Sequence, residues 1–216
     1  MILRELHTAY LHKGSLFSTF GFFILALFCV SLAIGPNEVL LKQSAPGLIW
    51  ILAILTIFFS TPLLLKREAQ HGLLDEILLH PSLTSTYLLS KVMAECLFIG
   101  LPLACISFLL SPLFSLSSAE ATSLFATLLI GFPALSALGL LGSLLTLNTQ
   151  GGGILLSLII LPLTLPLLIF GLSVMEMTRL GLDSFPSFCL LTGISLFLVI
   201  LGITAGSWAL PFAAER

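Results

Sequence analysis

The polar side chains that could do chemistry gather in one stretch of this chain, residues 66–81. Wound as a helix, the stretch places four apolar side chains on one face, those of Leu73, Leu74, Ile77 and Leu78. Three acidic side chains fall on the other face, those of Glu68, Asp75 and Glu76. The pattern predicts an amphipathic helix at about 68–80 that lies against a membrane surface. It fits an ordinary interfacial helix and a docking element for a partner protein equally well.

A second stretch, the turn at 148–153, contains a run of three glycines. A phosphate-binding P-loop needs glycines that bring backbone N–H groups onto phosphate, and a Lys after them. No Lys follows this run, which is instead typical of a flexible reversal between two helices. We therefore expect no catalytic residue here and no enzyme, and any ATP hydrolysis would belong to a separate subunit.

Titratable side chains elsewhere give weaker signals. Glu95 lies at the edge of an apolar run, and Lys91 one turn earlier predicts an ion pair between the two rather than an ion pathway. The histidines, at positions 7, 12, 71 and 80, fall outside the apolar runs, which favours solvated side chains over a shared metal site. The four cysteines form no CxxC motif. The sequence thus predicts no metal and no directly bound cofactor.

Prolines interrupt several apolar runs, and one pair stands out. Pro162 and Pro166 flank Thr164 near the middle of a run. Each proline removes a backbone hydrogen bond, and in a membrane the freed carbonyl needs another donor, for which the Thr164 hydroxyl is available. We expect a broken helix at a functional interface here. Gly202 and Gly206, four residues apart in the last run, predict a face for close helix packing.

The elements that must position these residues are membrane helices. Of the 216 residues, 58% are hydrophobic and 8% are charged, whereas a soluble domain carries about 25% charged residues. Six runs reach the roughly 20 apolar residues that a spanning helix needs. They cover residues 16–34, 46–65, 87–110, 122–147, 154–174 and 188–210. The fold class is therefore all-α, a polytopic integral membrane protein with six transmembrane helices in one domain, 1–216.

The distribution of charge predicts the orientation and excludes one class of partner. With the N-terminus inside, six of the eight Lys and Arg residues lie on the cytoplasmic side, and only Lys42 and Arg179 lie outside. The positive-inside rule favours this arrangement, so both termini are expected in the cytoplasm. The net charge of −2 provides no basic field for nucleic acid.

Five segments give the chain a resemblance to a known family. They are SLAIGP at 31–36, APGLIW at 45–50, GLLDEILL at 72–79 with Pro81 after it, KVMA at 91–94 and LSLIILPLTLPLLIFG at 156–171. Together they extend over nearly the whole length, and the chain resembles CcmB, the haem exporter protein B family of cytochrome c maturation. The family often has Glu-Gln where this chain has Asp75 and Glu76.

The resemblance implies the membrane (permease) subunit of an ABC transporter, of the ABC-2 exporter type, in the bacterial inner membrane. Two copies of the chain would pair with two copies of an ATPase subunit, CcmA, so that ATP acts through the partner. The haem-handling protein CcmC, the small subunit CcmD and the haem chaperone CcmE would join them. Haem would be the cargo, or the complex would release the haem-loaded chaperone. The helix at 68–80 would then dock the ATPase.

Two other functions fit the same residues. One is an ABC-2-type exporter for another small amphiphile, and the other is a membrane scaffold of the maturation machinery that transports nothing. A neighbouring ATPase gene would favour the transporter interpretations, and loss of c-type cytochromes on deletion would separate maturation from general export.

Overall fold

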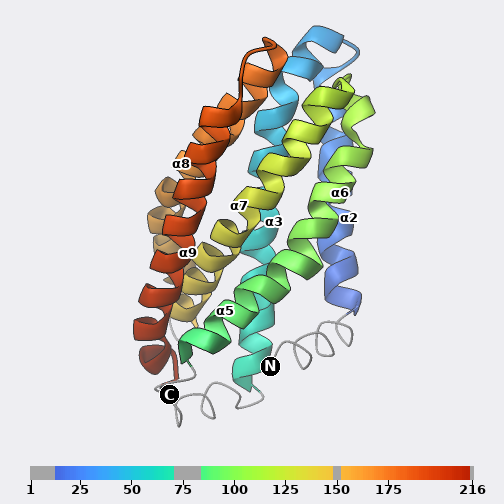
Figure 1. The fold of residues 1–216 in the computed structure, drawn as a ribbon. Helices are drawn as coiled ribbons and strands as arrows, with labels where there is room; N and C mark the ends of the chain where they lie inside the picture. Colours follow the sequence, from blue (N-terminus) through green and yellow to red (C-terminus); the bar gives the residue numbers. More distant parts are fainter. Residues whose placement is uncertain (1–12, 71–83, 148–151, 215–216) are drawn as a thin grey trace.

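The computed structural model describes residues 13–70, 84–147 and 152–214 (Figure 1). In these residues every regular element is a helix or a helical turn. In chain order they are α2 (Lys13–Ile34), α3 (Glu38–Gln70), α5 (Thr84–Glu95), the π-helical turn η2 (Cys96–Gly100), α6 (Leu101–Leu109), the 3₁₀ turn η3 (Ser111–Phe114), α7 (Ser118–Thr146), α8 (Gly152–Arg179) and α9 (Phe185–Ala214). With α5, η2 and α6 taken as one rod, six helices are long and apolar enough to cross a membrane. The all-α prediction of six spans is confirmed.

The helices extend beyond the apolar runs that predict them, and α3 does so most clearly. It begins at Glu38 because Asn37 caps its first turn. The Oδ1 atom of Asn37 accepts hydrogen bonds from the backbone N–H groups of Val39 at 3.1 Å and Leu40 at 3.2 Å. Pro46, expected near the start of this span, therefore lies inside the helix.

The third span is irregular where Pro102 interrupts its hydrogen bonds. Proline lacks an N–H group, and the turn η2 directly before α6 is wound as a π-helix instead of an α-helix. Gly100, at the end of η2, lies against the ring of Phe132 on α7, where a Cβ atom would stand 2.9 Å from Phe132 Cβ and Cγ. The π-turn and the glycine thus let this rod approach α7 closely. Such turns often mark functional positions in helices.

Helix α7 is the centre of the bundle and packs against α9, α8, α3 and α6 (Figure 1). In an apolar stretch of 18 residues within α7, 72% of the residues are buried, against 17% in the 18 residues of the α2 span. It meets α9 at Gly202, where an added Cβ would lie 2.9 Å from Ala137 Cβ and 3.0 Å from the Ala137 carbonyl oxygen. One turn later Gly206 faces Leu88 of α5. The predicted small-residue face is confirmed, and it packs within the chain.

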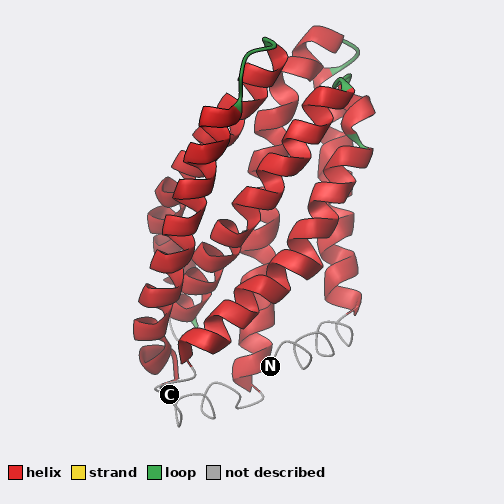
Figure 2. Ribbon diagram, in the orientation of Figure 1, coloured by secondary structure: helices red, strands yellow, loops and turns green. Residues whose placement is uncertain are grey.

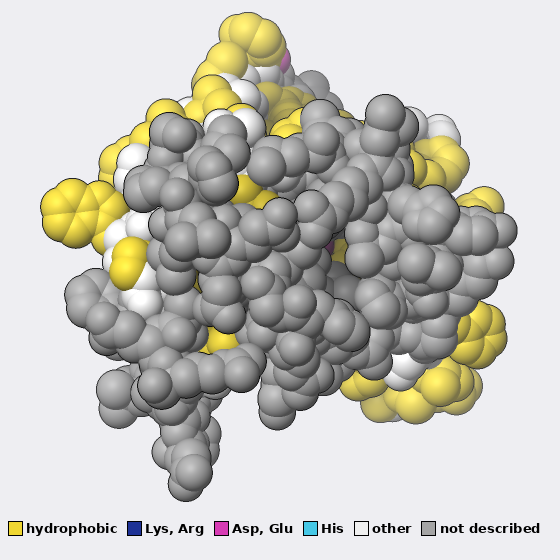
Figure 3. Space-filling model, turned by 90° about the horizontal axis from the view of Figure 1, so that it is seen from below, with side chains coloured by type: hydrophobic (Ala, Val, Ile, Leu, Met, Phe, Trp, Pro, Cys, Tyr) yellow, Lys and Arg dark blue, Asp and Glu magenta, His cyan; other side chains and the backbone are white. Residues whose placement is uncertain are grey.

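The surface of the bundle is apolar and several polar side chains are inside. Phe17 is 81% exposed and Trp208 is 79% exposed, whereas Thr127 and Ser136 are fully buried. Soluble proteins expose few large apolar patches, so a bilayer must cover this surface. Figure 3, a view along the bundle, shows apolar side chains of the described residues at the periphery of the molecule.

The two ends of the bundle differ in what they contain. The start of α2 and the end of α9 lie at one end, as an even number of spans requires (Figure 1). The opposite end carries the turns at 35–37, 110–117 and 180–184 (Figure 2), and we call it the turn end. By the distribution of Lys and Arg, the turn end is the one expected outside the cytoplasm.

Candidate functional site

The segment predicted to dock a partner falls largely outside the described residues. Helix α3 continues to Gln70, so Glu68 belongs to its last turn. The other predicted docking residues lie outside the described part of the chain: Leu73, Leu74, Asp75, Glu76, Ile77 and Leu78. In the sequence they follow α3 and precede α5. The docking helix at 68–80 stays a prediction.

Pro162 and Pro166 lie in an uninterrupted helix. Helix α8 passes through both prolines without an unwound segment; a functional break at these residues stays a prediction. Unwinding there would leave more backbone groups without partners in an apolar environment, which is costly. The hydroxyl of Thr164 donates to the Leu161 carbonyl at 2.8 Å, whereas the carbonyls that the two prolines free are those of Leu158 and Pro162. Both prolines are exposed and Thr164 is buried; a functional interface at these three residues stays a prediction.

Glu95 is buried in the half of the bundle away from the turn end. It is 5% exposed and stands directly before η2. The hydroxyl of Thr61 on α3 donates to Glu95 Oε1 and also lies 2.9 Å from the Ile57 carbonyl oxygen. Glu95 thus links α3 to the irregular third span. The ion pair expected between Glu95 and Lys91, which is 8% exposed, stays a prediction.

Trp50 occupies a slot at the centre of the bundle that two glycines leave open. The indole is fully buried. A Cβ atom added at Gly171 of α8 would lie 2.6 Å from Trp50 Cζ2, and one added at Gly131 of α7 would also overlap the ring. Among the described residues the indole N–H has no hydrogen-bond partner. Trp50 therefore holds α3, α7 and α8 together by close packing. Any larger residue at either glycine must displace the indole.

At the turn end, Glu120 contacts Lys42 and Arg179, the two basic residues that the sequence analysis expects outside the cytoplasm. This carboxylate is 2% exposed. Lys42 Nζ lies 3.1 Å from Glu120 Oε2, and Arg179 Nε lies 3.3 Å from Glu120 Oε1. The backbone N–H and the hydroxyl of Ser117 donate to Oε2 at 2.8 and 2.7 Å. The backbone N–H of Glu120 donates to Ser117 Oγ at 3.3 Å, which completes a capping box at the start of α7. A buried carboxylate needs such partners, and here they join α3, α7 and α8.

Arg179 also donates a hydrogen bond to a backbone carbonyl of α3 that has no backbone donor. Because Pro46 has no N–H group, the carbonyl of Lys42 lacks the hydrogen bond that a residue at this position would otherwise donate. Arg179 Nη2 donates to that carbonyl oxygen at 2.6 Å. Its Nη1 atom lies 3.4 Å from Glu176 Oε2, one turn earlier on α8. The guanidinium is therefore held in a fixed position by the two neighbouring helices.

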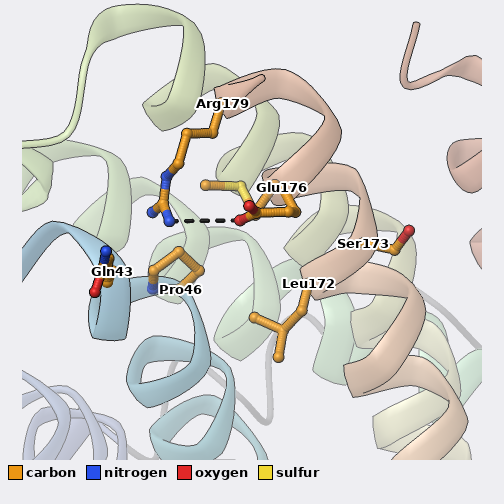
Figure 4. Close-up of a pocket in the computed structure, with 7 residues that line it drawn as sticks. Gln43, Pro46, Leu172, Ser173, Glu176 and Arg179 are labelled. Atoms are coloured by element: carbon orange, nitrogen blue, oxygen red, sulfur yellow. Dashed lines mark hydrogen bonds and ion pairs between the residues drawn. The ribbon is translucent and has the colours of Figure 1, made fainter. Parts of the chain in front are cut away.

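Beside this cluster, a cavity of about 310 Å³ lies between α3 and α8. Gln43 and Pro46 line it from α3, and Leu172, Glu176 and Arg179 line it from α8 (Figure 4). Ser173 and Met175 complete the lining. The cavity has a polar rim at the turn end and apolar walls below it. It can hold a group that is charged at one end and apolar at the other.

Sequence reasoning missed this cluster, although two signals for it were present. Lys42 and Arg179 were used only to orient the chain, and Glu120 was not singled out. The spacing of Ser117 and Glu120 is that of a capping box, and a proline inside a helix releases the carbonyl four residues earlier. Neither signal tells which helices meet. Among the described residues, no group of three or more His, Cys, Asp or Glu side chains could hold a metal ion.

Comparisons with known proteins agree along the whole chain. The family model for the CcmB protein matches residues 1–213. Heme exporter protein B of Pseudomonas aeruginosa is 33% identical over 209 residues, covering 95% of this chain and 94% of that protein. Heme exporter protein B of Escherichia coli K12 is 35% identical over 211 residues, covering 97% and 91%. That of Haemophilus influenzae is 36% identical over 181 residues, covering 84% and 82%.

These matches span all six helices, the Lys42–Glu120–Arg179 cluster and the segment between α3 and α5. The chain therefore belongs to the CcmB family of ABC-2-type transporter membrane subunits.

Proposed function

We propose that this chain is the membrane subunit of an ATP-driven complex that handles haem during cytochrome c maturation. The observation that carries the proposal is the match to the CcmB family over residues 1–213, which covers the complete six-helix bundle. The names of the relatives, heme exporter protein B, support haem as the molecule that the complex serves.

In this proposal, ATP is hydrolysed by a separate CcmA-like subunit. The chain lacks the glycine–lysine pattern of a P-loop, and the segment 68–80 provides an amphipathic surface for docking. Two copies of the chain pair with two ATPase subunits, and CcmC-like, CcmD-like and CcmE-like proteins join them. Movement of the ATPases then reaches the bundle through the ends of α3 and α5, which flank the docking segment.

The helices favour release of a haem-loaded chaperone over passage of haem through the bundle. All four histidines of the chain stand at positions 7, 12, 71 and 80, outside the six spans. A haem carried through the bundle by His ligation would need such a side chain within a span. No cofactor is therefore expected to bind this chain directly, and haem is the cargo or the substrate of the partner proteins.

In this proposal the complex lies in the bacterial inner membrane, and both termini of this chain lie in the cytoplasm. Lys and Arg favour that orientation by six to two. The two exceptions, Lys42 and Arg179, both pair with Glu120 at the turn end. Their charges are thus compensated on the side where the rule disfavours them.

Copurification tests the coupling to ATP. The tagged chain, expressed with its genomic neighbours and extracted in mild detergent, should bring down an ATPase subunit in equal amount. The purified assembly should hydrolyse ATP, and the chain alone should not. Hydrolysis by the chain alone, or isolation without any ATPase at every detergent tested, would contradict the proposal.

A further inference from the structure

The cavity between α3 and α8 combines opposite charges in a way that selects one class of ligand. At its rim the Glu176 carboxylate and the Arg179 guanidinium lie 3.4 Å apart, and the Glu176 side chain is 56% exposed. The nearby charges of Lys42 and Glu120 compensate each other. The rim is therefore neutral overall but dipolar. A ligand that carries one negative and one positive group fits it better than a simple anion does.

The guanidinium has donors left for a ligand. Arginine has five N–H groups, and three contacts occupy one each on Nε, Nη1 and Nη2, to Glu120, Glu176 and the Lys42 carbonyl. Because α3 and α7 fix the plane of the guanidinium, the remaining donors keep their direction without a further entropic cost. A phosphate oxygen is the natural acceptor for them.

Below the cavity, one face of α8 continues as an apolar track. Ile169, Leu165 and Leu161 follow Leu172 at intervals of three or four residues, which places all four on the face that carries Glu176. Ile169, Leu165 and Leu161 are 58%, 48% and 47% exposed. From Glu176 to Leu161 the helix rises about 22 Å, more than half of a hydrocarbon core of about 30 Å. Acyl chains could lie along the whole track.

We propose that this cavity binds the headgroup of an aminophospholipid, phosphatidylethanolamine, with its acyl chains along the α8 track. The phosphate meets Arg179, and the ammonium meets Glu176. The cavity of about 310 Å³ accommodates the headgroup and leaves the chains outside. The depth also agrees, since Arg179 is the last residue of α8, where the span reaches the headgroup region.

Native mass spectrometry of the full chain in detergent tests this site. Delipidated wild-type protein should bind added phosphatidylethanolamine at least about tenfold more tightly than phosphatidylglycerol, which has the phosphate but lacks the ammonium. Glu176→Gln should remove this preference, because the ammonium loses its partner while Arg179 still meets either phosphate. Asp183→Asn is the matched control, since Asp183 is an exposed acid in the same turn region and should leave the preference unchanged.

Three outcomes would overturn the proposal. Wild-type protein could bind the two lipids equally, or Glu176→Gln could keep the preference. Alternatively, Ile169→Cys could form a disulfide between two copies of the chain in phosphatidylethanolamine bilayers, which would assign the track to a second copy. Thermal unfolding of each variant without lipid shows that a lost preference does not reflect a lost fold. None of these results depends on the proposed role in cytochrome c maturation.

Discussion

The backbone carbonyl of Lys42 on α3 accepts a hydrogen bond from Arg179 Nη2 on α8, at 2.6 Å. The bond exists because Pro46 cannot supply the usual backbone donor. The same guanidinium lies 3.3 Å from Glu120 on α7. The backbone hydrogen bond that α3 lacks is thus replaced by a contact that links α3, α7 and α8 at the turn end of the bundle.

Glu120→Gln should weaken this link between the three helices. The variant keeps the size of the side chain and its capping of α7, but it removes the negative charge that both Lys42 and Arg179 contact. We expect a loss of about 2 kcal/mol in the free energy of unfolding, measured by thermal or denaturant unfolding in detergent. Glu176→Gln is the control, since its carboxylate is half exposed and should contribute less than about 1 kcal/mol. Equal losses in the two variants would contradict the central role of Glu120.

Gly131→Ala or Gly171→Ala should destabilise the bundle through Trp50. The added methyl group overlaps the indole in both variants, and overpacking of this kind costs about 1–3 kcal/mol. Replacing Trp50 with Leu in the same chain should recover part of the loss, which a double-mutant cycle would measure. Gly193→Ala provides the matched control, because no atom lies within 4 Å of the added Cβ. If Gly193→Ala were as harmful as the other two, helix α9 and not the Trp50 slot would be the sensitive element.

Pro162→Ala with Pro166→Ala should preserve insertion and impair cytochrome c maturation. The double variant supplies two backbone N–H groups that α8 lacks, while the exposed positions of both prolines leave the core unchanged. Membrane content of the chain and the level of haem-stained c-type cytochromes provide the two measurements. Normal maturation would reduce the prolines to neutral features of a continuous helix.

Leu74→Asp or Ile77→Asp should abolish copurification of the ATPase. Both residues lie on the predicted apolar face of the docking helix, and truncating a central buried residue of an interface typically costs about 2 kcal/mol or more. Asp75→Asn should only weaken the association, in a manner that depends on salt, because charges at a rim mainly orient the partner. Full recovery of the ATPase with both aspartate variants would place the docking site elsewhere, for example at the turn 148–153.

The sequence predicted the number, type and order of the spans, because length and hydropathy determine which segments a bilayer accepts. It also predicted the close packing at Gly202 and Gly206. It did not predict that Gly202 would meet Ala137, nor that Glu120 would meet Lys42 and Arg179, since helix partners in a membrane depend on three-dimensional packing of similar apolar surfaces. A break at Pro162 and Pro166 stays a prediction; α8 is helical through both prolines, because an apolar environment favours a hydrogen-bonded flanking backbone.

The most direct test of the proposed function is the content of c-type cytochromes in a strain that lacks this chain. Haem that is bound covalently to cytochromes survives denaturing electrophoresis and can be stained, while antibodies report the apoproteins. We predict that the deletion strain has lost all haem-stained c-type cytochromes but still makes the apoproteins, and that the wild-type chain on a plasmid restores the stain. Undiminished haem-stained cytochromes in the deletion strain would contradict a role in maturation and favour an exporter of another amphiphile.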